Sequence, residues 1–341
     1  MERLDYDVVI CTRNRLDALE LSIPSIVHQS RKPKSIIVVD SSDDHTKVVS
    51  LIRKISSDLD FEIRLFRSDI ASSSAQRNIG LNYVTSPIVF FPDDDSIFFP
   101  AASEEIMKVY ELDDESEVVG VCAVEAEAPP EGILEKPTYK LNFTDNIKKS
   151  IAVTRYKIES LFFEDPAKVL AHRLIDKKHT PDWMNQDDHT FVEYMTGFRM
   201  TFRTDAIISS KFCESFTGYC IGEDLEASLS VLNKGVLIGA KKARIYHHKY
   251  PSKRASGFSY GARQILNNAY IISKHSKDTI IRKLFLIRSK YKLFQYMLGA
   301  TSEFGRSRFK GGLYGYKNIK YLYAASNDNL DSVYKNITRN L

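Results

Sequence analysis

The chain has 341 residues, of which 43% are hydrophobic and 27% charged, with 15 Gly and 11 Pro. This length is enough for two average domains and this composition is that of a folded protein, so a disordered chain, a fibrous protein and a disulfide-stapled mini-protein are excluded. The formal net charge of +4 hides an uneven distribution, because residues 1–240 contain 27 Lys and Arg against 40 Asp and Glu, whereas the last 101 residues contain 21 against 4.

Short apolar runs alternate with helical patterns along the first hundred residues, which is typical of a parallel α/β sheet. Strands rich in Val, Ile and Phe are predicted over residues 6–11, 35–40, 61–66 and 88–91. Helices are predicted between them, over residues 16–29, 44–56 and 72–83. The first helix contains Pro24, which predicts a kink, and the third begins with serines that are able to cap it.

The pattern is less regular beyond this region. Residues 117–126 predict a fifth strand, whereas residues 127–190 show no clear periodicity. Order returns over residues 191–203, followed by a helix over 225–233 that ends before Gly235 and by a strand over 236–247. The segment PSKRASG then has the composition of a basic linker, and helices are predicted over 258–275 and 278–298. We accordingly divide the chain into an α/β domain, residues 1–250, and a basic helical region, residues 251–341.

The last predicted helix, residues 278–298, is amphipathic. Its apolar stripe consists of Ile281, Leu284, Phe285, Ile287, Tyr291, Phe294 and Leu298, and its basic residues are Arg282, Lys283, Arg288, Lys290 and Lys292. Such a helix fits an anionic membrane surface, while a solvated face and a clamp against the acidic domain stay open as alternatives. Nucleic acid is not expected as a partner, because the single Trp lies outside this region and no RNA-binding signature occurs.

Neither the cysteines nor the N-terminus indicates secretion. The four cysteines, Cys11, Cys122, Cys213 and Cys220, form no C-x-x-C pair, which favours reduced thiols in the cytoplasm and argues against a zinc site. The apolar run near the N-terminus has only six residues, too few for a signal peptide or a spanning helix. We expect a cytoplasmic protein whose contact with the inner face of the membrane is peripheral.

Ligands of an open parallel sheet bind beyond the carboxyl ends of its strands, so polar residues there are the first candidates for a site. Thr12 and Arg13 follow the first strand, Asp40 ends the second, and Asp93-Asp94-Asp95 follows the fourth. No G-x-G-x-x-G follows the first strand and no P-loop signature occurs. These absences argue against a dinucleotide-binding Rossmann domain and against a P-loop NTPase.

Acidic and histidine side chains at three places point to metal-assisted chemistry. The triplet Asp93-Asp94-Asp95 cannot be buried unpaired, and Mg²⁺ or Mn²⁺ is a fitting partner, although acidic surface turns are also common. Glu223-Asp224, at the start of a predicted helix, suits either a general base or complementarity to the helix dipole. His247-His248 closes the last strand, where a neutral imidazole can complete a metal shell or serve a structural role.

Seven segments occur in an order and spacing that resemble the family 2 glycosyltransferases of the GT-A fold. They are VVICTRNR, IIVVDSSDD, AQRNIGL, FFPDDDS, MTGFRMTFRTD, GEDLEASLSVLNKG and ARIYHH, and the resemblance extends over residues 5–250. It implies an α/β fold with a Rossmann-like, mostly parallel sheet flanked by helices, to which a basic α-helical C-terminal extension is added. It also implies an inverting transfer of a sugar from a UDP- or dTDP-sugar to a glycan or lipid-linked acceptor in surface polysaccharide synthesis.

The resemblance also implies roles for individual residues. It implies nucleotide-sugar contacts for Thr12, Arg13, Asp40, Arg77, Asp93, Asp94 and Glu223, a catalytic base at Asp224, and metal binding by Asp95 and His247, with His248 as the adjacent candidate. Mn²⁺ or Mg²⁺ is the implied cofactor. The sequence departs from the family pattern at Cys11, where proline is usual, and at Arg13, where an aromatic residue is frequent. A guanidinium plane at Arg13 would then replace an aromatic ring beside the base.

Two other functions stay open at this point. A sugar-1-phosphate nucleotidyltransferase shares such a sheet and acidic metal site, but CTRNRLD lacks the usual glycine-rich G-x-G-T-R loop. A non-catalytic carbohydrate- or membrane-binding module with a degenerate site is the other alternative. Acceptor specificity is expected within residues 127–200, where the candidates are Trp183, Tyr194, Thr196 and Gly197, and Lys253-Arg254 would add positive potential near the diphosphate. Self-association into a homo-oligomer is compatible with the sequence.

Overall fold

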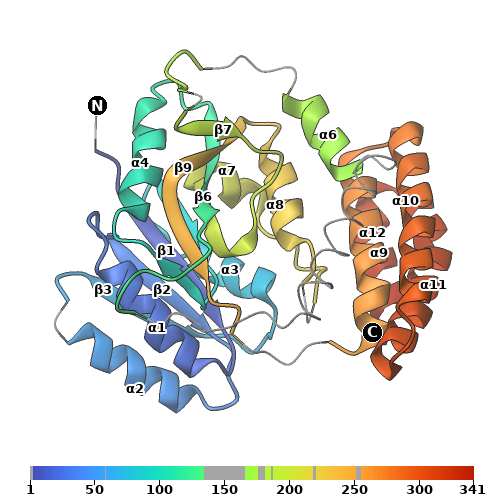
Figure 1. Ribbon diagram of the computed structural model, residues 1–341, viewed down its shortest axis with the longest axis horizontal. Coiled ribbons are helices and arrows are strands. Elements are labelled where there is room, and N and C mark those ends of the chain that lie inside the picture. Colours follow the sequence, from blue (N-terminus) through green and yellow to red (C-terminus); the bar gives the residue numbers. More distant parts are fainter. Residues whose placement is uncertain are drawn as a thin grey trace, which may run out of the picture. The chain divides into compact units, whose positions relative to one another are not determined.

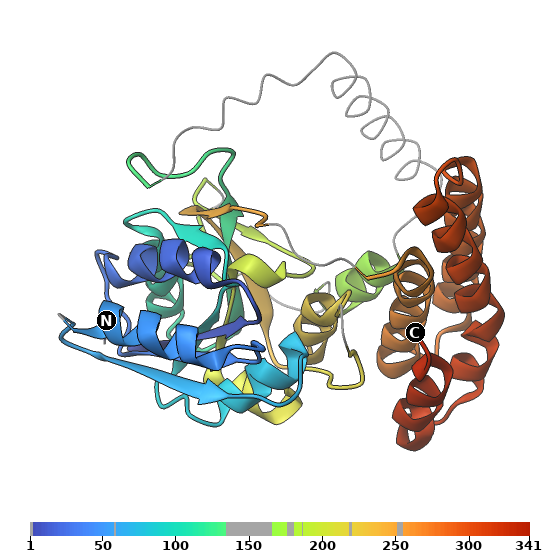
Figure 2. The same ribbon diagram turned by 90° about the horizontal axis from the view of Figure 1, so that it is seen from below.

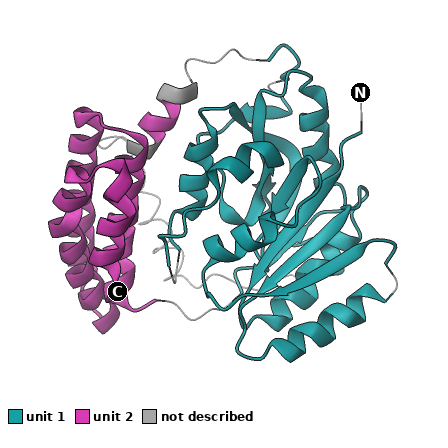
Figure 3. Cartoon of the chain, turned by 180° about the vertical axis from the view of Figure 1, so that it is seen from behind, with its two compact units in different colours: residues 1–135, 174–253 teal, residues 136–173, 254–341 magenta. Residues whose placement is uncertain are grey.

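The computed structural model describes residues 3–57, 59–133, 166–175, 181–185, 187–217, 220–250 and 255–341. The chain forms two compact units (Figure 3). The first unit combines residues 1–135 with 174–253, and the second combines residues 136–173 with 254–341. The described residues 166–173 therefore group with the C-terminal helices, although they precede the boundary predicted at residue 250.

Within the described residues, nine strands form one sheet in the first unit (Figure 1). They are β1 (Tyr6–Thr12), β2 (Ser35–Asp40), β3 (Glu62–Arg67), β4 (Ile88–Phe91), β5 (Ser96–Phe98), β6 (Val118–Glu125), β7 (His189–Phe191), β8 (Met200–Arg203) and β9 (Val236–His247). Their order is β3-β2-β1-β4-β8-β6-β9-β5, with β7 also paired to β9. The strands β3, β2, β1 and β4 run parallel, β6 is parallel to β9, and β5, β7 and β8 run antiparallel to their neighbours.

Helices cover both faces of this sheet (Figure 1, Figure 2), which confirms the expected α/β fold. One face packs against α1 (Leu16–Val27), α2 (His45–Ser56) and α4 (Ala102–Leu112), and the other against α3 (Ser73–Leu81), α7 (Thr204–Ser210) and α8 (Glu223–Val231). Because successive side chains of a strand point to opposite faces, Val8 and Ile10 join the core under α1, while Val9 faces α3. Gly80 lets α3 approach the sheet, since a Cβ at this position would overlap the Val9 side chain.

Six of the nine strands in the described residues lie where the sequence pattern predicts them. β2, β4 and β9 begin and end at the predicted residues, and β1, β3 and β6 differ by no more than one residue at either end. Pro24 lies inside α1, and the helix continues past it to Val27. Ser72 precedes α3, but its side chain accepts no hydrogen bond from the first turn, and its hydroxyl donates to the Phe216 carbonyl (3.2 Å).

Several elements of the first unit are not predicted by the sequence pattern. They are α4, α7, the strands β5, β7 and β8, and the short 3-10 turn η1 (Gly197–Arg199). β5, β7 and β8 have only three or four residues each, too few to show a periodicity. β5 exists because it pairs with the distant strand β9, with Ser96 opposite His247. Its position is therefore a property of the folded sheet.

The second unit is helical (Figure 3). It contains α9 (Gly257–His275), α10 (Thr279–Leu298), α11 (Glu303–Ala324), η2 (Asn327–Asn329) and α12 (Leu330–Thr338), and α6 (Pro166–Ile175) crosses its boundary at residue 173. The sequence pattern predicts α9 and α10 but misses α11 and α12. The glycines that obscure α11 allow it to pack closely on α9: a Cβ at Gly261 or Gly311 would overlap the backbone of the facing helix. Glycine has a low helix propensity, so α11 is stabilised by its close packing on α9.

The apolar stripe predicted for α10 is divided between two faces of the helix. Ile281 and Phe285 are buried, whereas Ile287, Phe294 and Leu298 are 51%, 51% and 57% exposed. The expectation of one continuous stripe is wrong because α11 packs along α10 and covers part of it. Among the described helices, none combines the length and the apolar character that crossing a bilayer requires.

Candidate active site

The candidate site lies at the carboxyl ends of β1 and β4 and at the end of β9. The loop after β4 lies beside β1, where Asp93 pairs with Cys11 in an isolated parallel bridge. β5 follows at once and places Ser96 opposite His247. Three stretches that are far apart in the sequence therefore meet around the acidic triplet.

Asp94 is buried beneath the loop that follows β1. Thr12 donates a hydrogen bond to its Oδ2 (2.8 Å), and the Arg15 guanidinium contacts its Oδ1 (2.5 Å). Burial raises the pKa of Asp94 to about 7, although both of these partners favour the ionised carboxylate. Both oxygens of this predicted donor-binding residue are thus engaged by protein groups.

Asp95 uses one oxygen for the protein and directs the other into the site. Its Oδ2 accepts hydrogen bonds from Arg15 (2.5 Å) and from the backbone N–H of Tyr250 (2.9 Å). Its Oδ1 is buried, lies 3.4 Å from His247 Nε2, and accepts no hydrogen bond from any residue in the described ranges. Burial by itself raises the pKa of Asp95, but His247 and Arg15 together hold it at about 2, so the carboxylate is ionised.

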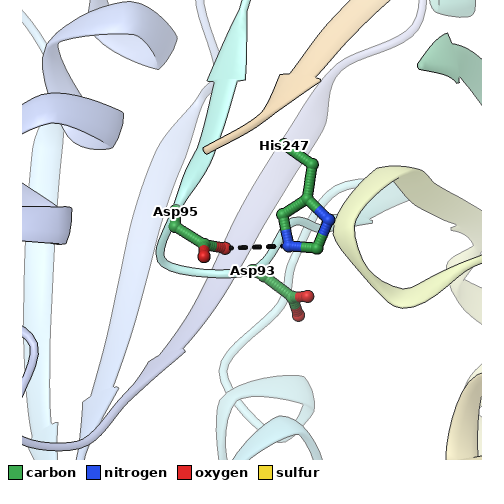
Figure 4. A group of neighbouring side chains, drawn as sticks. All are labelled: Asp93, Asp95 and His247. Carbon is green, nitrogen blue, oxygen red and sulfur yellow. Dashed lines mark ion pairs between the residues drawn. The ribbon is translucent and has the colours of Figure 1, made fainter. Parts of the chain in front are cut away.

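Asp93, Asp95 and His247 form a group suited to a metal ion (Figure 4). Each side chain offers one ligand atom, and these atoms lie within 4.8 Å of one another. His247 is held in place by stacking on Phe198, with ring centroids 4.6 Å apart and planes inclined by 10°. Two carboxylates and an imidazole suit Mn²⁺, and with water also Mg²⁺. The unsatisfied Oδ1 of Asp95 is the atom that such an ion would satisfy.

The structure distinguishes His247 from its neighbour His248. His248 donates its backbone N–H to the carbonyl of Asp95 (3.0 Å), and its ring lies beside those of Tyr246 and Tyr250, with centroids 6.4 and 6.1 Å apart. Since successive residues of a strand point to opposite sides, only one of the two histidines reaches the acidic group. That residue is His247.

A second cluster lies at the start of α8 and contains Arg77, Glu223 and Asp224. Arg77 is buried and pairs with Asp93 (2.9 Å) and Glu223 (3.2 Å). Burial opposes the charge of Arg77, but the two carboxylates outweigh it and raise its pKa. Gly222 has a φ of +86°, a left-handed conformation that favours glycine, and it directs the chain into α8 at Glu223.

Asp224 lies in the first turn of α8 and is oriented by backbone donors. Its Oδ2 accepts a hydrogen bond from Gly197 (3.1 Å) and its Oδ1 from Leu225 (2.8 Å). Gly197 also connects Asp224 to the metal group, because a Cβ at this glycine would lie 3.6 Å from Asp93 Oδ1. Burial raises the pKa of Asp224, and burial together with the charge of Asp224 raises that of Glu223 to about 8. Asp224 is therefore a better proton acceptor than an exposed aspartate.

Asp40 and Arg13 lie outside these two clusters. Asp40 is fully buried, accepts a hydrogen bond from the Ser42 backbone N–H (2.8 Å) and contacts His45 Nδ1 (2.6 Å). The side chain of Arg13 is 54% exposed and lies 3.8 Å from Asp43. The predicted site residues that the structure does bring together are Thr12, Arg77, Asp93, Asp94, Asp95, Glu223, Asp224 and His247.

Two residues that the sequence pattern does not single out, Arg15 and Tyr250, contact the acidic triplet. Arg15 stands in the CTRNRLD segment, two residues after Arg13, but no periodicity distinguishes the two arginines. Asn14 between them has a φ of +54°, and the turn that it makes decides which arginine reaches the site. Only the folded loop therefore reveals the role of Arg15.

The expected acceptor region, residues 127–200, is described only in part, because residues 134–165 and 176–180 lie outside the described residues. Lys253 and Arg254 also lie outside them. Trp183 meets the ring of His189 edge-on, with centroids 5.6 Å apart, and Thr196 accepts a hydrogen bond from Arg199 (2.8 Å). Tyr194 is 38% exposed.

Comparison with known proteins places this chain in a family. The profile of the family described as "Glycosyl transferase family 2" matches residues 7–199, more than half of the chain. The chain therefore belongs to glycosyl transferase family 2 and is a glycosyltransferase. Among curated proteins, none matches it at a significant level.

Solved structures of glycosyltransferases share its fold. Residues 1–349 of TarS from S. aureus give a TM-score of 0.53 at 14% identity, over 98% of this chain and 90% of that one. The same TarS segment in complex with UDP-GlcNAc gives 0.52 at 13% identity, over 98% and 91%. The mannosyltransferase PcManGT from Pyrobaculum calidifontis, in complex with GDP-Man and Mn²⁺, gives 0.54 at 14% identity, over 100% and 89%. At these identities the likeness shows the fold alone, which is the GT-A fold.

Proposed function

We propose that this protein is an inverting, metal-dependent glycosyltransferase that moves a sugar from a nucleotide-sugar donor to a glycan or lipid-linked acceptor. The observation that carries the proposal is a possible metal-binding group at the sheet rim, Asp93, Asp95 and His247, close to the buried carboxylate of Asp224. Gly197 lies between the two. Transfer of a sugar from a diphosphate to a hydroxyl group needs both a charge stabiliser and a proton acceptor.

The metal group would hold Mn²⁺ or Mg²⁺. When bound, the cation supplies Lewis-acid stabilisation of the negative charge that develops on the leaving diphosphate. The complex of PcManGT with GDP-Man and Mn²⁺ supports this cofactor class. Arg77 adds a fixed positive charge beside Asp93, where it needs no reorganisation during the reaction.

Asp224 would act as the general base. As the acceptor oxygen forms its bond to the anomeric carbon, the bond from that carbon to the diphosphate breaks, and the hydroxyl proton passes to the Asp224 carboxylate. A single displacement of this kind inverts the anomeric configuration. The backbone N–H groups of Gly197 and Leu225 hold the carboxylate in one orientation, and burial raises its pKa.

The loops at the carboxyl ends of β1, β2 and β4 would bind the nucleotide part of the donor. We propose a UDP- or dTDP-sugar, with contacts from Thr12, Arg13, Asp40, Arg77, Asp93, Asp94 and Glu223. The complexes of TarS with UDP-GlcNAc and of PcManGT with GDP-Man support a nucleotide-sugar donor as a class. The Arg13 side chain is 54% exposed, and its planar guanidinium would stack on the base.

We also propose that the helical unit contacts an anionic membrane surface on its cytoplasmic side. The exposed residues of α10 include Ile280, Lys283, Ile287, Lys290, Phe294, Met297 and Leu298. Apolar side chains flanked by lysines are typical of helices that lie in a lipid interface. Such contact would bring the site to a lipid-linked acceptor of the kind used in surface polysaccharide synthesis.

The test uses two incubations with Mn²⁺, one with a panel of nucleotide sugars and lipid-linked or oligosaccharide acceptors, and one with nucleoside triphosphates and sugar 1-phosphates. A glycosyltransferase releases a nucleoside diphosphate. A sugar-1-phosphate nucleotidyltransferase instead releases pyrophosphate from a nucleoside triphosphate, and a non-catalytic module releases neither. Release of pyrophosphate, or of nothing across the panel, contradicts the proposed function.

A further inference from the structure

The guanidinium of Arg15 contacts two of the three aspartates of the acidic triplet. Its Nη1 lies 2.5 Å from Asp94 Oδ1, and its Nη2 lies 2.5 Å from Asp95 Oδ2. Its Nη2 also donates to the carbonyl of Tyr250 (3.1 Å), and the side chain is only 20% exposed. Arg15 thus provides a fixed positive charge inside the group that would bind a metal ion.

Hydrogen bonds on both sides of Arg15 stabilise its contact with Asp94 and Asp95. Asn14 donates its backbone N–H to Ser42 (2.7 Å) and exchanges side-chain and backbone hydrogen bonds with Asp43 (2.9 Å each), which fixes the turn before Arg15. On the other side, the Tyr250 hydroxyl donates to Asp17 (2.7 Å). Hydrogen bonds within the protein therefore hold both the turn that precedes Arg15 and the tyrosine beside its guanidinium.

Asp95 would be shared between this guanidinium and the metal ion. Its Oδ2 is occupied by Arg15 and Tyr250, while its Oδ1 faces Asp93 and His247 (Figure 4). A cation bound at Oδ1 would share the Asp95 carboxylate with Arg15, whose guanidinium contacts the other oxygen, Oδ2. Arg77 places a second positive charge on Asp93. Two of the three candidate ligands are thus already paired with arginines.

We propose that Arg15 is a built-in counter-ion of the metal site, which makes tight binding of the divalent cation depend on the diphosphate of the nucleotide. This inference rests on the proposed function. Without nucleotide, Arg15 repels the cation and competes for the charge of Asp95. When a nucleoside diphosphate is present, its phosphate oxygens add negative charge and metal ligands, so the cation binds despite Arg15. A unit charge so close changes the affinity about tenfold or more.

The binding of Mn²⁺ and the binding of UDP are thermodynamically linked, so the proposal can be tested by affinities. The factor by which UDP increases the affinity for Mn²⁺ equals the factor by which Mn²⁺ increases the affinity for UDP. A neutral residue at position 15 should increase the affinity of the nucleotide-free protein for Mn²⁺ and reduce this factor. If Arg15 only oriented Asp95, both its neutral and its lysine replacements would weaken Mn²⁺ binding.

The experiment measures free Mn²⁺ by electron paramagnetic resonance, with MnCl₂ alone and with UDP or GDP. We expect Arg15→Met to bind Mn²⁺ about tenfold more tightly than the wild type without nucleotide and to show a smaller effect of nucleotide. Arg15→Lys keeps the charge and should behave as the wild type. Arg53→Met removes the same charge from an exposed position in α2, outside the site, and should change nothing.

The outcomes separate this inference from the proposed function. Unchanged or weaker Mn²⁺ binding by Arg15→Met, while the wild type binds Mn²⁺ with nucleotide, overturns the role of Arg15 and leaves the function standing. Absence of Mn²⁺ binding by the wild type even with UDP and GDP overturns both. Arg15→Gln is a second neutral variant for the case in which Arg15→Met does not fold, which thermal unfolding will show.

Discussion

Two arginines divide the acidic residues of the site between them. Arg77 pairs with Asp93 and Glu223, and Arg15 pairs with Asp94 and Asp95. Arginine suits both positions, because its planar fork contacts two carboxylates at once and does not lose its charge on burial. The carboxylates can therefore stay close together before any cation binds.

Asp224 is the residue whose replacement tests the chemistry most directly. A positioned general base contributes roughly 10² to 10⁴ in rate, so we expect Asp224→Asn to lower turnover by about that factor. Nucleotide binding should survive, because the amide keeps the size of the side chain. Steady-state rates and UDP binding by calorimetry measure the two effects. Transfer at the wild-type rate would show that Asp224 is not the base.

Asp95→Ala, unlike Asp224→Asn, should weaken the binding of nucleotide. It removes a proposed metal ligand whose ionised form is stabilised by His247 and Arg15. We expect the affinity for UDP in the presence of Mn²⁺ to fall at least about tenfold, and the affinity for UDP without metal to change little. Calorimetric titrations with and without Mn²⁺ give both values. An equal loss in the two titrations would mean that Asp95 binds nucleotide and not metal.

The raised pKa of Glu223 predicts a pH dependence of stability. Its carboxyl has a pKa of about 8 in the folded protein against an ordinary 4.5, so folding favours its protonated form. This contribution is complete below about pH 4.5 and is lost as the pH rises through about 8. Glu223→Gln cannot ionise, and its Tm should therefore fall less than that of the wild type between these pH values.

Thermal unfolding of the ligand-free protein across this pH range measures the difference. Glu115→Gln makes the same change at an exposed position and should keep the wild-type slope. Parallel pH profiles for the wild type and Glu223→Gln would contradict the assignment of the buried carboxyl.

At the scale of elements, the site consists of strand ends and helix beginnings. The carboxyl ends of β1 and β4 meet there because parallel neighbours end at the same edge of the sheet, and α8 begins there with Glu223 and Asp224. The short antiparallel strand β5 pairs with β9 and brings His247 to this edge. Strands that the sequence predicts, such as β1 and β4, therefore form most of the site, and the short strand β5 adds His247 to it.

The exposed face of α10 gives a prediction for an element outside the site. Ile287 and Phe294 are each 51% exposed, so polar replacements should leave the helical unit folded. We expect Ile287→Asn with Phe294→Asn to reduce binding to vesicles of phosphatidylcholine and phosphatidylglycerol about thirtyfold or more, since burial of each side chain in lipid is worth on the order of 1 kcal/mol or more. Vesicle sedimentation measures the loss.

Salt and a matched variant serve as controls for this prediction. Raising the ionic strength should weaken binding of the wild type, because Lys283 and Lys290 contribute through charge. Ile208→Asn changes an exposed isoleucine of α7, 44% exposed, and should bind vesicles normally. Binding that is insensitive both to salt and to the α10 substitutions would exclude this face as the membrane contact.

At the scale of the whole molecule, charge and fold are distributed between two units. The α/β unit contains the acidic site, while the described residues 255–341 hold 15 Lys and Arg against 4 Asp and Glu. The proposed divalent cation and the proposed anionic lipid would thus each meet a unit of opposite charge. The net charge of +4 conceals this division.

Much of the α/β fold could be predicted because its signals are local. Strand patterns of four to twelve residues locate β1, β2, β3, β4, β6 and β9 to within one residue, and the acidic triplet begins two residues after the end of β4. α11 could not be predicted, since its glycines weaken the helical pattern and are explained only by its close contact with α9. The division of the α10 stripe depends on the same unpredicted helix.

The sequence by itself determined the α/β class, the family resemblance and the candidate carboxylates, because each of these depends on residues that are close together in the chain. Tertiary structure decided that His247 and not His248 joins Asp93 and Asp95, and that Arg15 and not Arg13 contacts the triplet. It also decided that Asp95 Oδ1 faces His247 and accepts no hydrogen bond from the described residues. The physical reason is that these choices depend on strand pairing, on one left-handed turn at Asn14, and on contacts between residues far apart in the chain.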